Sequence, residues 1–288
     1  MPGRPALVAQ CSDIRYIAHV NKSLRLYQTG AAADYVDDRL AAGFVSFSLD
    51  DLVAHTGLSV IAARNQLLRL GDKVVGVSPR QQYFLIVTPE HRSFGAPPVD
   101  WWLGDYMQWL GHPYYLALQS AATAFGSSQQ AIQETQVITD TQRRGLTIGR
   151  IRIRFFMKSG AKRTLVQELP GADAPLMVST PESTLIDLVR HAHKLGGIER
   201  VAETMEPLLP TVKTGSLHRA LATEAETATA QRLGFILEVL GAGKLVKAVR
   251  AWLPANLAPV LLSTHVAGDR AAPPHPTWLV INNGLVFR

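Results

Sequence analysis

The sequence has one cysteine, Cys11, among its 288 residues. A single thiol excludes a disulfide framework and a cysteine-based zinc site, and such usage is typical of a reducing compartment. No uninterrupted apolar run approaches the roughly 20 residues that cross a membrane. The first sixteen residues also lack the continuous apolar core of a secretory signal. We therefore expect a soluble, cytoplasmic protein with no membrane partner.

Motifs of catalysis and cofactor binding are missing as well. The sequence contains no P-loop, GxGxxG, HExxH, GxSxG or zinc-ligand spacing. His191 and His193 are two residues apart, which on a helix points their side chains about 200° from each other and does not suit one metal ion. Cys11 has no obvious base beside it. We expect no catalytic residue, no metal and no cofactor, and hence no enzyme.

What the chain does have is apolar residues and positive charge. Apolar residues make up 47% of the sequence, including nine Phe, seven Tyr and five Trp, enough for a sizeable buried core. The length suits about two domains. Lysine and arginine exceed the carboxylates by six, and the isoelectric point is about 9.6. This excess is compatible with a polyanionic partner. The net charge alone does not identify such a partner, and the distribution of the charges along the chain is more informative.

The clearest break along the chain is residues 88–100, where three prolines and a glycine interrupt any periodic pattern. It separates a compact block from a longer mixed region. We predict four segments: an N-terminal extension (1–30), a winged helix-turn-helix DNA-binding domain (31–90), a linker (91–100) and an α+β domain (101–288).

The predicted DNA-binding domain rests on an ordered series of elements. Gly43 and Gly57 are expected to end two helices, and Ser48 and Ser59 to cap the helices that follow them. A short extended piece, Phe44–Phe47, separates the first two helices. The predicted order is helix 31–43, helix 49–57, helix 60–70, and a hairpin of strands 74–77 and 83–87, which is the winged helix-turn-helix plan.

Helix 60–70 is the expected recognition helix. Helical periodicity predicts one apolar stripe and one polar face. The stripe is Val60, Ala63, Leu67 and Leu70, with Ile61 and Leu68 at its border, and the opposite face is Ala62, Asn65, Gln66 and Arg69. Arginine can pair with guanine and Asn or Gln with adenine. The predicted DNA-binding residues are Ser59, Arg64, Asn65, Gln66, Arg69, Lys73 and Arg80.

The remaining members of that set are assigned to the phosphate backbone. Arg64 would reach a phosphate or an acidic neighbour, and Ser59 would donate to a phosphate from the helix N-terminus. Lys73 and Arg80 would clamp the backbone. Solvent-facing helices commonly carry such residues without binding DNA, and winged helices also serve as protein–protein modules.

The region after residue 100 alternates between helical and extended patterns. It is predicted as helices 100–111 and 114–126, with Pro113 at the start of the second, then strands 136–140, 149–157, 164–169 and 176–180, helices 181–197, 198–209, near 215–225 and 229–241, and a terminal strand 277–282. This series predicts an α+β domain.

A strongly basic segment runs from Thr141 to Gln167 without one acidic residue. In its strand, arginines alternate with apolar residues and so share one face. The predicted basic surface of the C-terminal domain is Arg143, Arg144, Arg150, Arg152, Arg154, Lys158, Lys162 and Arg163. It would bind phosphates of DNA or RNA, form a solvated face, or provide partners for helix carboxylates such as Glu182 and Asp187.

The combined order of segments resembles a known family. After the winged helix pattern come YYLALQSAATAFG (114–126), GRIRIRFF, STPESTLIDLVR (179–190), GGIERVAE (196–203) and QRLGFILEVLG. Together they resemble the AbiEi-like antitoxins of bacterial abortive-infection systems, which are type IV toxin–antitoxin modules. The similarity covers roughly residues 31–288.

The resemblance implies a repressor that binds inverted-repeat operator DNA upstream of its own operon in the bacterial cytoplasm. It also implies a C-terminal domain that counteracts a co-encoded nucleotidyltransferase toxin without forming a stable complex with it.

Two other functions remain compatible with the sequence. One is a ligand-responsive transcription factor, whose C-terminal domain should contain an apolar pocket with a few convergent polar groups, whereas an antitoxin should show a basic surface and no such pocket. The other is an RNA-binding regulator that uses the basic strand.

Overall fold

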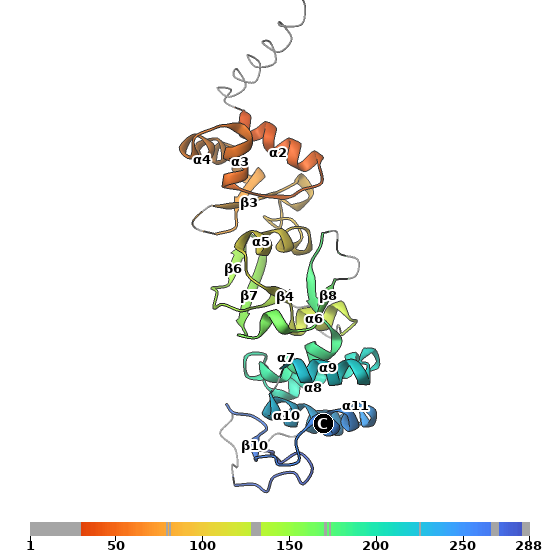
Figure 1. Ribbon diagram of the computed structural model, residues 1–288. Coiled ribbons are helices and arrows are strands. Elements are labelled where there is room, and N and C mark those ends of the chain that lie inside the picture. Colours follow the sequence, from red (N-terminus) through yellow and green to blue (C-terminus); the bar gives the residue numbers. More distant parts are fainter. Residues whose placement is uncertain are drawn as a thin grey trace, which may run out of the picture. The chain divides into compact units, whose positions relative to one another are not determined.

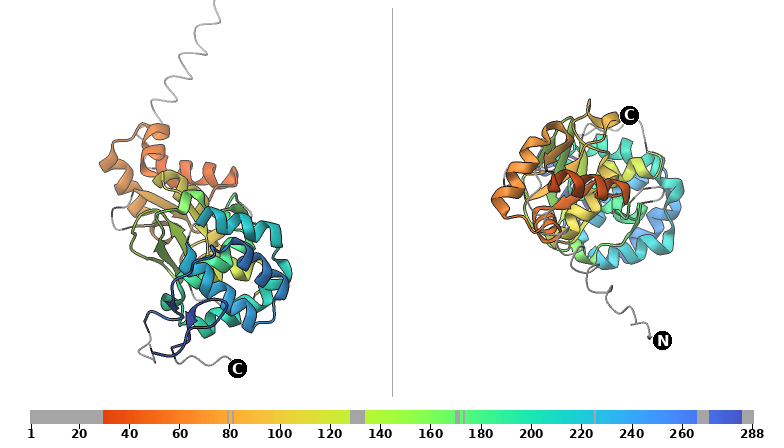
Figure 2. Two further views of the ribbon diagram at one scale, coloured as in Figure 1. Left: turned by 60° about the horizontal axis from the view of Figure 1, so that its bottom comes forward. Right: turned by 90° about the horizontal axis from the view of Figure 1, so that it is seen from above.

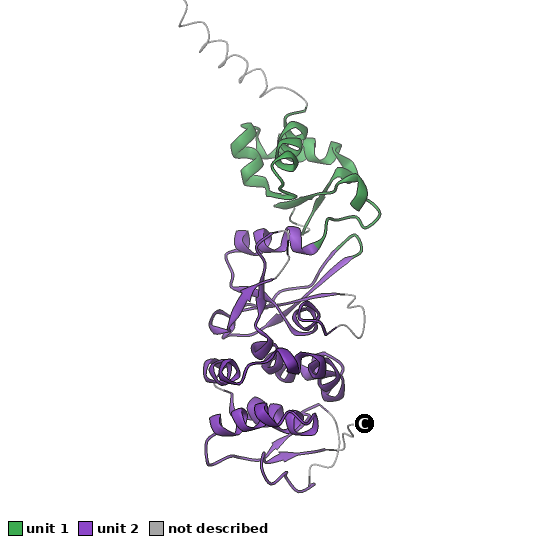
Figure 3. Cartoon of the chain, turned by 90° about the vertical axis from the view of Figure 1, so that its right-hand side faces the viewer, with its two compact units in different colours: residues 1–98, 148–150 green, residues 99–147, 151–288 purple. Residues whose placement is uncertain are grey.

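The computed structural model describes residues 30–78, 80, 82–127, 134–169, 172, 174–224, 226–265 and 271–283. The predicted extension before residue 30 lies outside these residues. The chain divides into two compact units (Figure 3). Unit 1 comprises the residues up to Pro98 together with Ile148–Arg150, and unit 2 comprises Val99–Thr147 and Ile151–Arg288. No helix among the described residues is long and apolar enough to cross a membrane.

The described part of unit 1 contains three α-helices and a three-stranded antiparallel sheet in the order β1-β3-β2. Ser48 begins the second helix with a capping box, because its hydroxyl accepts the Asp51 N–H at 3.0 Å while the Asp51 carboxylate accepts the Ser48 N–H. Gly57 ends that helix with φ +69°. The elements are α2 (Ala31–Ala41), β1 (Ser46–Ser48), α3 (Leu49–Thr56), α4 (Val60–Arg69), β2 (Val74–Gly76) and β3 (Tyr83–Ile86).

The core of unit 1 lies between its helices and its sheet. Phe47 of β1 stacks on Phe84 of β3 at 5.6 Å, and Tyr35 of α2 meets Phe47 edge-on at 5.4 Å. Ala63 and Leu67 place one side of α4 in the same core. These contacts fix which side of α4 remains exposed.

The short segment Ile148–Arg150 belongs to unit 1 because of a close backbone approach. The Arg150 N–H donates to the Phe94 carbonyl at 2.8 Å. Gly149 has φ +55°, and a Cβ there would lie 2.1 Å from that carbonyl. Only glycine fits, so the predicted strand 149–157 loses its first two residues to this turn.

Unit 2 is built on a mixed six-stranded sheet in the order β6-β7-β5-β4-β9-β8 (Figure 1). The pairs β5·β7 and β4·β9 are parallel, whereas β4·β5 and β8·β9 are antiparallel. The mixed sheet and helices confirm the α+β class. The strands are β4 (Tyr114–Leu116), β5 (Thr135–Thr139), β6 (Leu146–Ile148), β7 (Ile151–Met157), β8 (Val166–Glu168) and β9 (Met177–Ser179).

The predicted helix beginning at Pro113 is wrong in its first half. Tyr114–Leu116 is a central strand, and helix α6 begins only at Leu118. Tyr115 pairs with Ile138, and Leu116 pairs with Val178. Pairing on both sides overrides the helical pattern, and aromatic and aliphatic side chains favour such a buried strand.

Among the described residues of unit 2 there are seven α-helices. Those after residue 180 lie in layers beyond the sheet in Figure 1 and lie together in both views of Figure 2. α10 packs on α7 and α11. The last helix, α11, was not predicted, and a parallel strand pair, β10 (Val260–Leu261) with β11 (Val280–Ile281), follows it. The helices are α5 (Leu103–Leu110), α6 (Leu118–Ala124), α7 (Pro181–Arg190), α8 (Ile198–Met205), α9 (Thr214–Glu224), α10 (Thr227–Val239) and α11 (Gly243–Trp252).

Candidate functional sites

The exposed face of α4 carries three of the predicted base-reading or phosphate-binding side chains. Arg64, Asn65 and Arg69 are all exposed. Neither arginine forms an ion pair within the part of unit 1 that the structure describes. α4 itself contains no acidic residue. Donor groups on this face are therefore available to an external acceptor.

Gln66 does not belong to that face. Its side-chain Oε1 accepts the backbone N–H of Ala32 at 2.9 Å, and the residue is only partly exposed. This bond satisfies one of the free N–H groups at the start of α2. The prediction that Gln66 points outward is wrong, because the buried side of α4 centres on Ala63 and Leu67 rather than on the stripe through Val60.

The orientation of α4 also exposes side chains that were predicted in the apolar stripe (Val60) or at its border (Ile61 and Leu68). Ile61 is 74% exposed, Leu68 is 81% exposed and Val60 is 43% exposed. Ile61 and Leu68 are seven residues apart and share one line along the helix. Arg64 and Asn65 lie between them, so the outward face alternates apolar and polar groups.

Positive charge predominates in the stretch of sequence in unit 1 that contains this helix. Residues 31–56 hold five carboxylates and one arginine, whereas residues 57–87 hold four basic residues and one carboxylate. That carboxylate, Asp72, pairs with Arg92 at 3.7 Å. Ser59, Lys73 and Arg80 are exposed beside α4, and Ser59 caps the helix by accepting the Ala62 N–H. At the hairpin tip, residues 79 and 81 lie outside the described residues.

The predicted basic surface divides into several environments. Arg150 belongs to unit 1, and Arg143 is partly buried. Arg154 is paired with Glu134 at 3.3 Å on the surface. The other exposed members of the predicted basic surface in unit 2 are Arg144, Arg152, Lys162 and Arg163.

Lys158 is not a surface residue, which corrects the prediction. Its ammonium is buried and contacts Asp187 Oδ1 at 2.8 Å and Glu224 Oε1 at 2.6 Å. The alternation of β7 changes after Arg154, so that Phe156 and Lys158 point inward and Met157 outward. The adjacent aromatic residues Phe155 and Phe156 were the signal in the sequence that a simple alternation ends there.

Lys158 is part of a buried ion network that joins β7, α7, α9 and the start of α10. Arg190 contacts Asp187 at 2.6 Å and Glu224 at 2.7 Å, and it reaches Glu226 at 3.0 Å. Burial alone would lower the pKa of the Arg190 guanidinium, but Asp187 and Glu224 outweigh burial and raise it. The sequence indicated Asp187 as a possible partner, whereas Glu224 and Glu226 had no local signal because they lie more than 60 residues from Lys158.

Tyr115 connects this network to the sheet. Its hydroxyl donates to Asp187 Oδ2 at 2.8 Å. Burial, and then the charge of Asp187, raise the pKa of Tyr115 well above its usual value. Tyr115 therefore remains a hydrogen-bond donor at any physiological pH.

His191 lies beside the network at the end of α7. Burial, followed by the charges of Arg190 and Lys194, lowers the pKa of His191 to about 3. Its ring meets Phe156 edge-on at 5.5 Å, and its Nε2 has no hydrogen-bond partner among the described residues. This imidazole is neutral in the folded protein. His193, in the turn after α7, stacks instead on His265.

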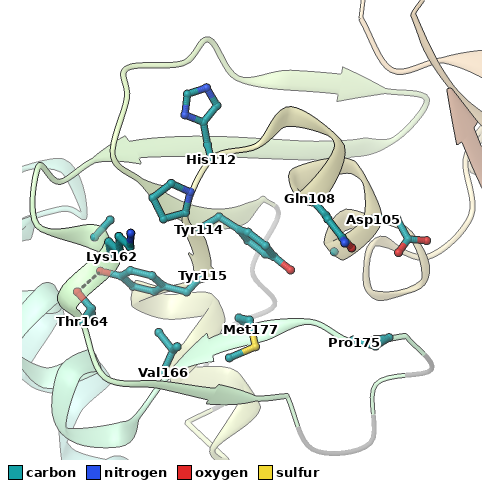
Figure 4. A pocket seen from close by; sticks show the side chains of 13 residues that line it. Asp105, Gln108, His112, Tyr114, Tyr115, Lys162, Thr164, Val166, Pro175 and Met177 are labelled. Carbon is teal, nitrogen blue, oxygen red and sulfur yellow. Dashed lines mark hydrogen bonds between the residues drawn. The ribbon is translucent and has the colours of Figure 1, made fainter. Parts of the chain in front are cut away.

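Unit 2 also contains a cavity of about 440 Å³ between β4, the β8–β9 hairpin and α5 (Figure 4). Tyr114 extends into it, with Gln108 and Met177 on different sides. Tyr115 and Thr164 line the cavity and also belong to the buried network, where their hydroxyls lie 3.3 Å apart. Its walls combine apolar groups with a few polar ones. A pocket of this kind is expected for a ligand-responsive transcription factor rather than for an antitoxin.

No group of three or more metal-binding side chains occurs among the residues the structure describes. The sites therefore offer hydrogen bonding and charge, on α4 and around the cavity.

Part of unit 2 is similar to a known protein family. Residues 115–239 match the family model described as the AbiEi antitoxin C-terminal domain. All five charged residues of the buried network lie within this range. A search of curated proteins gave no match.

Two solved structures are similar to the chain. The RV2827C protein from Mycobacterium tuberculosis has a TM-score of 0.61 at 17% identity, over 87% of this chain and 90% of that one. At this identity the match shows a common fold alone. An antigenic nucleotidyltransferase-like protein from Paracoccidioides brasiliensis has a TM-score of 0.37 at 11% identity, over 53% of this chain and 91% of that one, and no inference is drawn from it.

Proposed function

We propose, from the match of residues 115–239 to the AbiEi antitoxin C-terminal domain, that this chain is an antitoxin that also represses its own operon. Unit 1 binds inverted-repeat operator DNA, and unit 2 opposes a nucleotidyltransferase toxin encoded beside it. The antitoxin acts without catalysis and without a stable complex with the toxin.

The exposed, acid-free face of α4 is the observation that supports DNA binding. The order of α2, α3, α4 and the β2–β3 hairpin suits a winged helix-turn-helix, in which the third helix enters the major groove. In this arrangement Asn65 and Arg69 read base edges and Arg64 contacts the backbone. Ser59, Lys73 and Arg80 hold phosphates on either side.

The exposed apolar side chains extend this readout. Ile61 and Leu68 share the outward face with Asn65 and are too exposed to serve the core. Apolar side chains distinguish thymine by contact with its C5 methyl group. Seven residues span about 10.5 Å of helix, so we propose that the two side chains contact thymines about three base pairs apart.

For unit 2, the exposed arginines of the basic segment support contact with nucleic acid. Arg152 faces solvent on β7, and Gly145 lies against Ile153, which brings Arg144 close to the same strand. Reversing Arg152 and Arg154 to Glu should cost no more than about 1–2 kcal/mol of stability, because it replaces the surface pair of Arg154 and Glu134 by two like charges, and it should impair either operator occupancy or toxin neutralisation. Full activity in both assays would show that Arg152 and Arg154 face solvent and have no role in binding nucleic acid.

The test of DNA binding uses the full chain and a duplex from the region immediately upstream of its reading frame. Asn65→Ala or Arg69→Ala should each cost about 1–3 kcal/mol at this duplex and leave binding to unrelated DNA nearly unchanged. Lys73→Ala or Arg80→Ala should weaken binding to both and reduce the salt slope by about one unit. Arg250→Ala serves as the control, because Arg250 is an exposed arginine on α11 of unit 2. Unchanged operator affinity of the Asn65 and Arg69 variants in fluorescence anisotropy would reject the role of α4.

A second candidate function, a ligand-responsive repressor, is favoured by the cavity of about 440 Å³. Cavities of this size hold small molecules, and its mixed lining suits one. Val166→Trp would fill part of the cavity. Under this second function the variant should change repression in a reporter strain, whereas a plain antitoxin should repress as the wild type does.

A further inference from the structure

A second, smaller pocket in unit 2 lies apart from the cavity of Figure 4. It is formed by the turn after α7, the first turn of α8, one face of α10 and the segment that follows β10. It measures about 50 Å³. Its side chains with hydrogen-bonding groups are Arg190, His193, Arg232, Ser263, Thr264 and His265.

Arg232 supplies a positive charge that the protein does not neutralise by direct contact. Its Nε donates to the Leu261 carbonyl at 2.8 Å, and it forms no ion pair with any carboxylate that the structure describes. Burial lowers the pKa of Arg232, and the charge of Glu226 offsets this only in part. Arg190, by contrast, is held by three carboxylates. A half-buried cation without a partner is costly unless an anion joins it.

Two imidazoles add ring N–H groups to the pocket. His193 and His265 stack with their ring centres 4.2 Å apart. Burial lowers the pKa of His193, and the neighbouring His265 and Lys194 lower it further. An anion in the pocket would oppose this effect and favour the protonated form of His193.

Backbone geometry provides further donors. Gly197 precedes α8 with φ +99° and offers no side-chain cap, and both Gly197 and Ile198 line the pocket. The N-terminus of a helix favours anions through its free N–H groups and its dipole. Ser263 and Thr264 place two hydroxyl groups on the opposite wall.

We propose that this pocket binds a single phosphoryl-sized oxyanion, with Arg232 as its charge partner and His193, His265 and the N-terminus of α8 as additional donors. A space of about 50 Å³ admits a few water molecules and therefore one tetrahedral anion. Inorganic phosphate and the phosphate of a small monoester share this chemistry. The site is independent of DNA binding by unit 1.

The test is thermal unfolding of the full chain in a phosphate-free buffer, with sodium phosphate or adenosine monophosphate added at constant ionic strength. Ligand that binds only the folded protein raises the melting temperature in a saturable way. Phosphate should do so with half-saturation near or below about 1 mM. Arg232→Gln, which keeps an amide donor for the Leu261 carbonyl, should abolish the saturable shift, whereas Arg250→Gln on the exposed side of α11 should retain it.

His193→Gln provides a second variant, since His193 is exposed enough to be replaced without loss of the fold. It should raise the half-saturation concentration. Sulfate, whose charge is constant above pH 5, should bind more tightly at pH 6 than at pH 8, because a bound anion offsets the lowered pKa of His193 and favours its protonated form. The other charged or titratable groups that face His193 here are Arg190, Lys194, Arg232 and His265.

The carboxylates near the pocket should have only a weak influence on the difference in sulfate affinity between pH 6 and pH 8. Glu226 has a lowered pKa and stays ionised over the range, and Glu199 is exposed in the first turn of α8.

Each outcome decides the proposal. A saturable shift with both ligands supports a site for free phosphate, and a shift with the monophosphate alone supports a site for a phosphomonoester, provided Arg232→Gln removes it. No saturable shift with either ligand overturns the proposal. An equal shift in wild type and Arg232→Gln also overturns it, since the effect would then come from ions elsewhere on the protein.

Discussion

Two helices of equal length, α4 in unit 1 and α7 in unit 2, use similar residues in opposite ways. Both have ten residues, and each ends in an arginine, Arg69 or Arg190. Arg190 is buried against three carboxylates, whereas Arg69 is exposed without an ion pair within the described part of unit 1. Arginine on α7 therefore stabilises the fold, and arginine on α4 is available to a partner.

The difference comes from what packs around each helix. α7 is covered by the sheet and by α9 and α10, and these elements bring Lys158 and Glu224 to its charged residues. One side of α4 contacts α2 and α3, and the arginines on its other side pair with no carboxylate among the described residues. A buried charge requires a partner inside the protein, but an exposed charge does not.

The largest effect is expected from removing one partner of the buried network. Lys158→Met leaves Arg190 as the cationic partner of both Asp187 and Glu224 among the described residues, and breaking such a buried pair costs about 3–5 kcal/mol of unfolding free energy. Lys162→Met, four residues further on in the same basic segment, is exposed and should cost less than about 0.5 kcal/mol. Chemical denaturation followed by circular dichroism measures both. Equal losses in the two variants would contradict the distinction between them.

A smaller effect is expected from the pH dependence of His191. Its pKa is about 3 in the folded protein and about 6.5 when unfolded, so the unfolded state binds more protons between these values. Stability should therefore fall as the pH drops below 6.5, by about 2 kcal/mol between pH 7 and pH 5.

His191→Leu should flatten this part of the stability curve, while His218→Gln on the exposed side of α9 should not. A wild-type protein equally stable at pH 5 and pH 7 would contradict the burial of a neutral imidazole.

The smallest effect concerns thymine contacts on α4. Replacing the operator thymines by deoxyuridine removes only methyl groups, each worth about 0.8 kcal/mol when buried, or about fourfold in affinity. Leu68→Ala should make binding less sensitive to this replacement, and Leu40→Ala on α2 should not. If wild-type affinity is the same on both duplexes, Ile61 and Leu68 do not contact thymine.

The sequence predicted most elements of unit 1 because their signals are local. The caps at Ser48 and Ser59, the stop at Gly57 and the strands on either side of the hairpin all depend on neighbouring residues. The rotation of α4 was less predictable, because periodicity alone does not show that Gln66 bonds to Ala32 while Ile61 faces solvent.

In unit 2 the strands β5 and β7–β9 and most helices after residue 180 were predicted from periodicity. The strand at Tyr114–Leu116 was missed, because its pairing partners are distant in the sequence. The role of Lys158 depends on Glu224, 66 residues away. The cavity and the oxyanion pocket also arise from segments that only the fold brings together.

The most direct test of the account separates the two units in the full chain. The double variant Asn65→Ala/Arg69→Ala should lose operator binding by about tenfold or more and still rescue cells that express the neighbouring nucleotidyltransferase. Its melting temperature should match that of the wild type, because both side chains are exposed. A folded double variant that binds the operator with unchanged affinity, or that fails to rescue these cells, would contradict the assignment of DNA binding to α4 and of toxin neutralisation to unit 2.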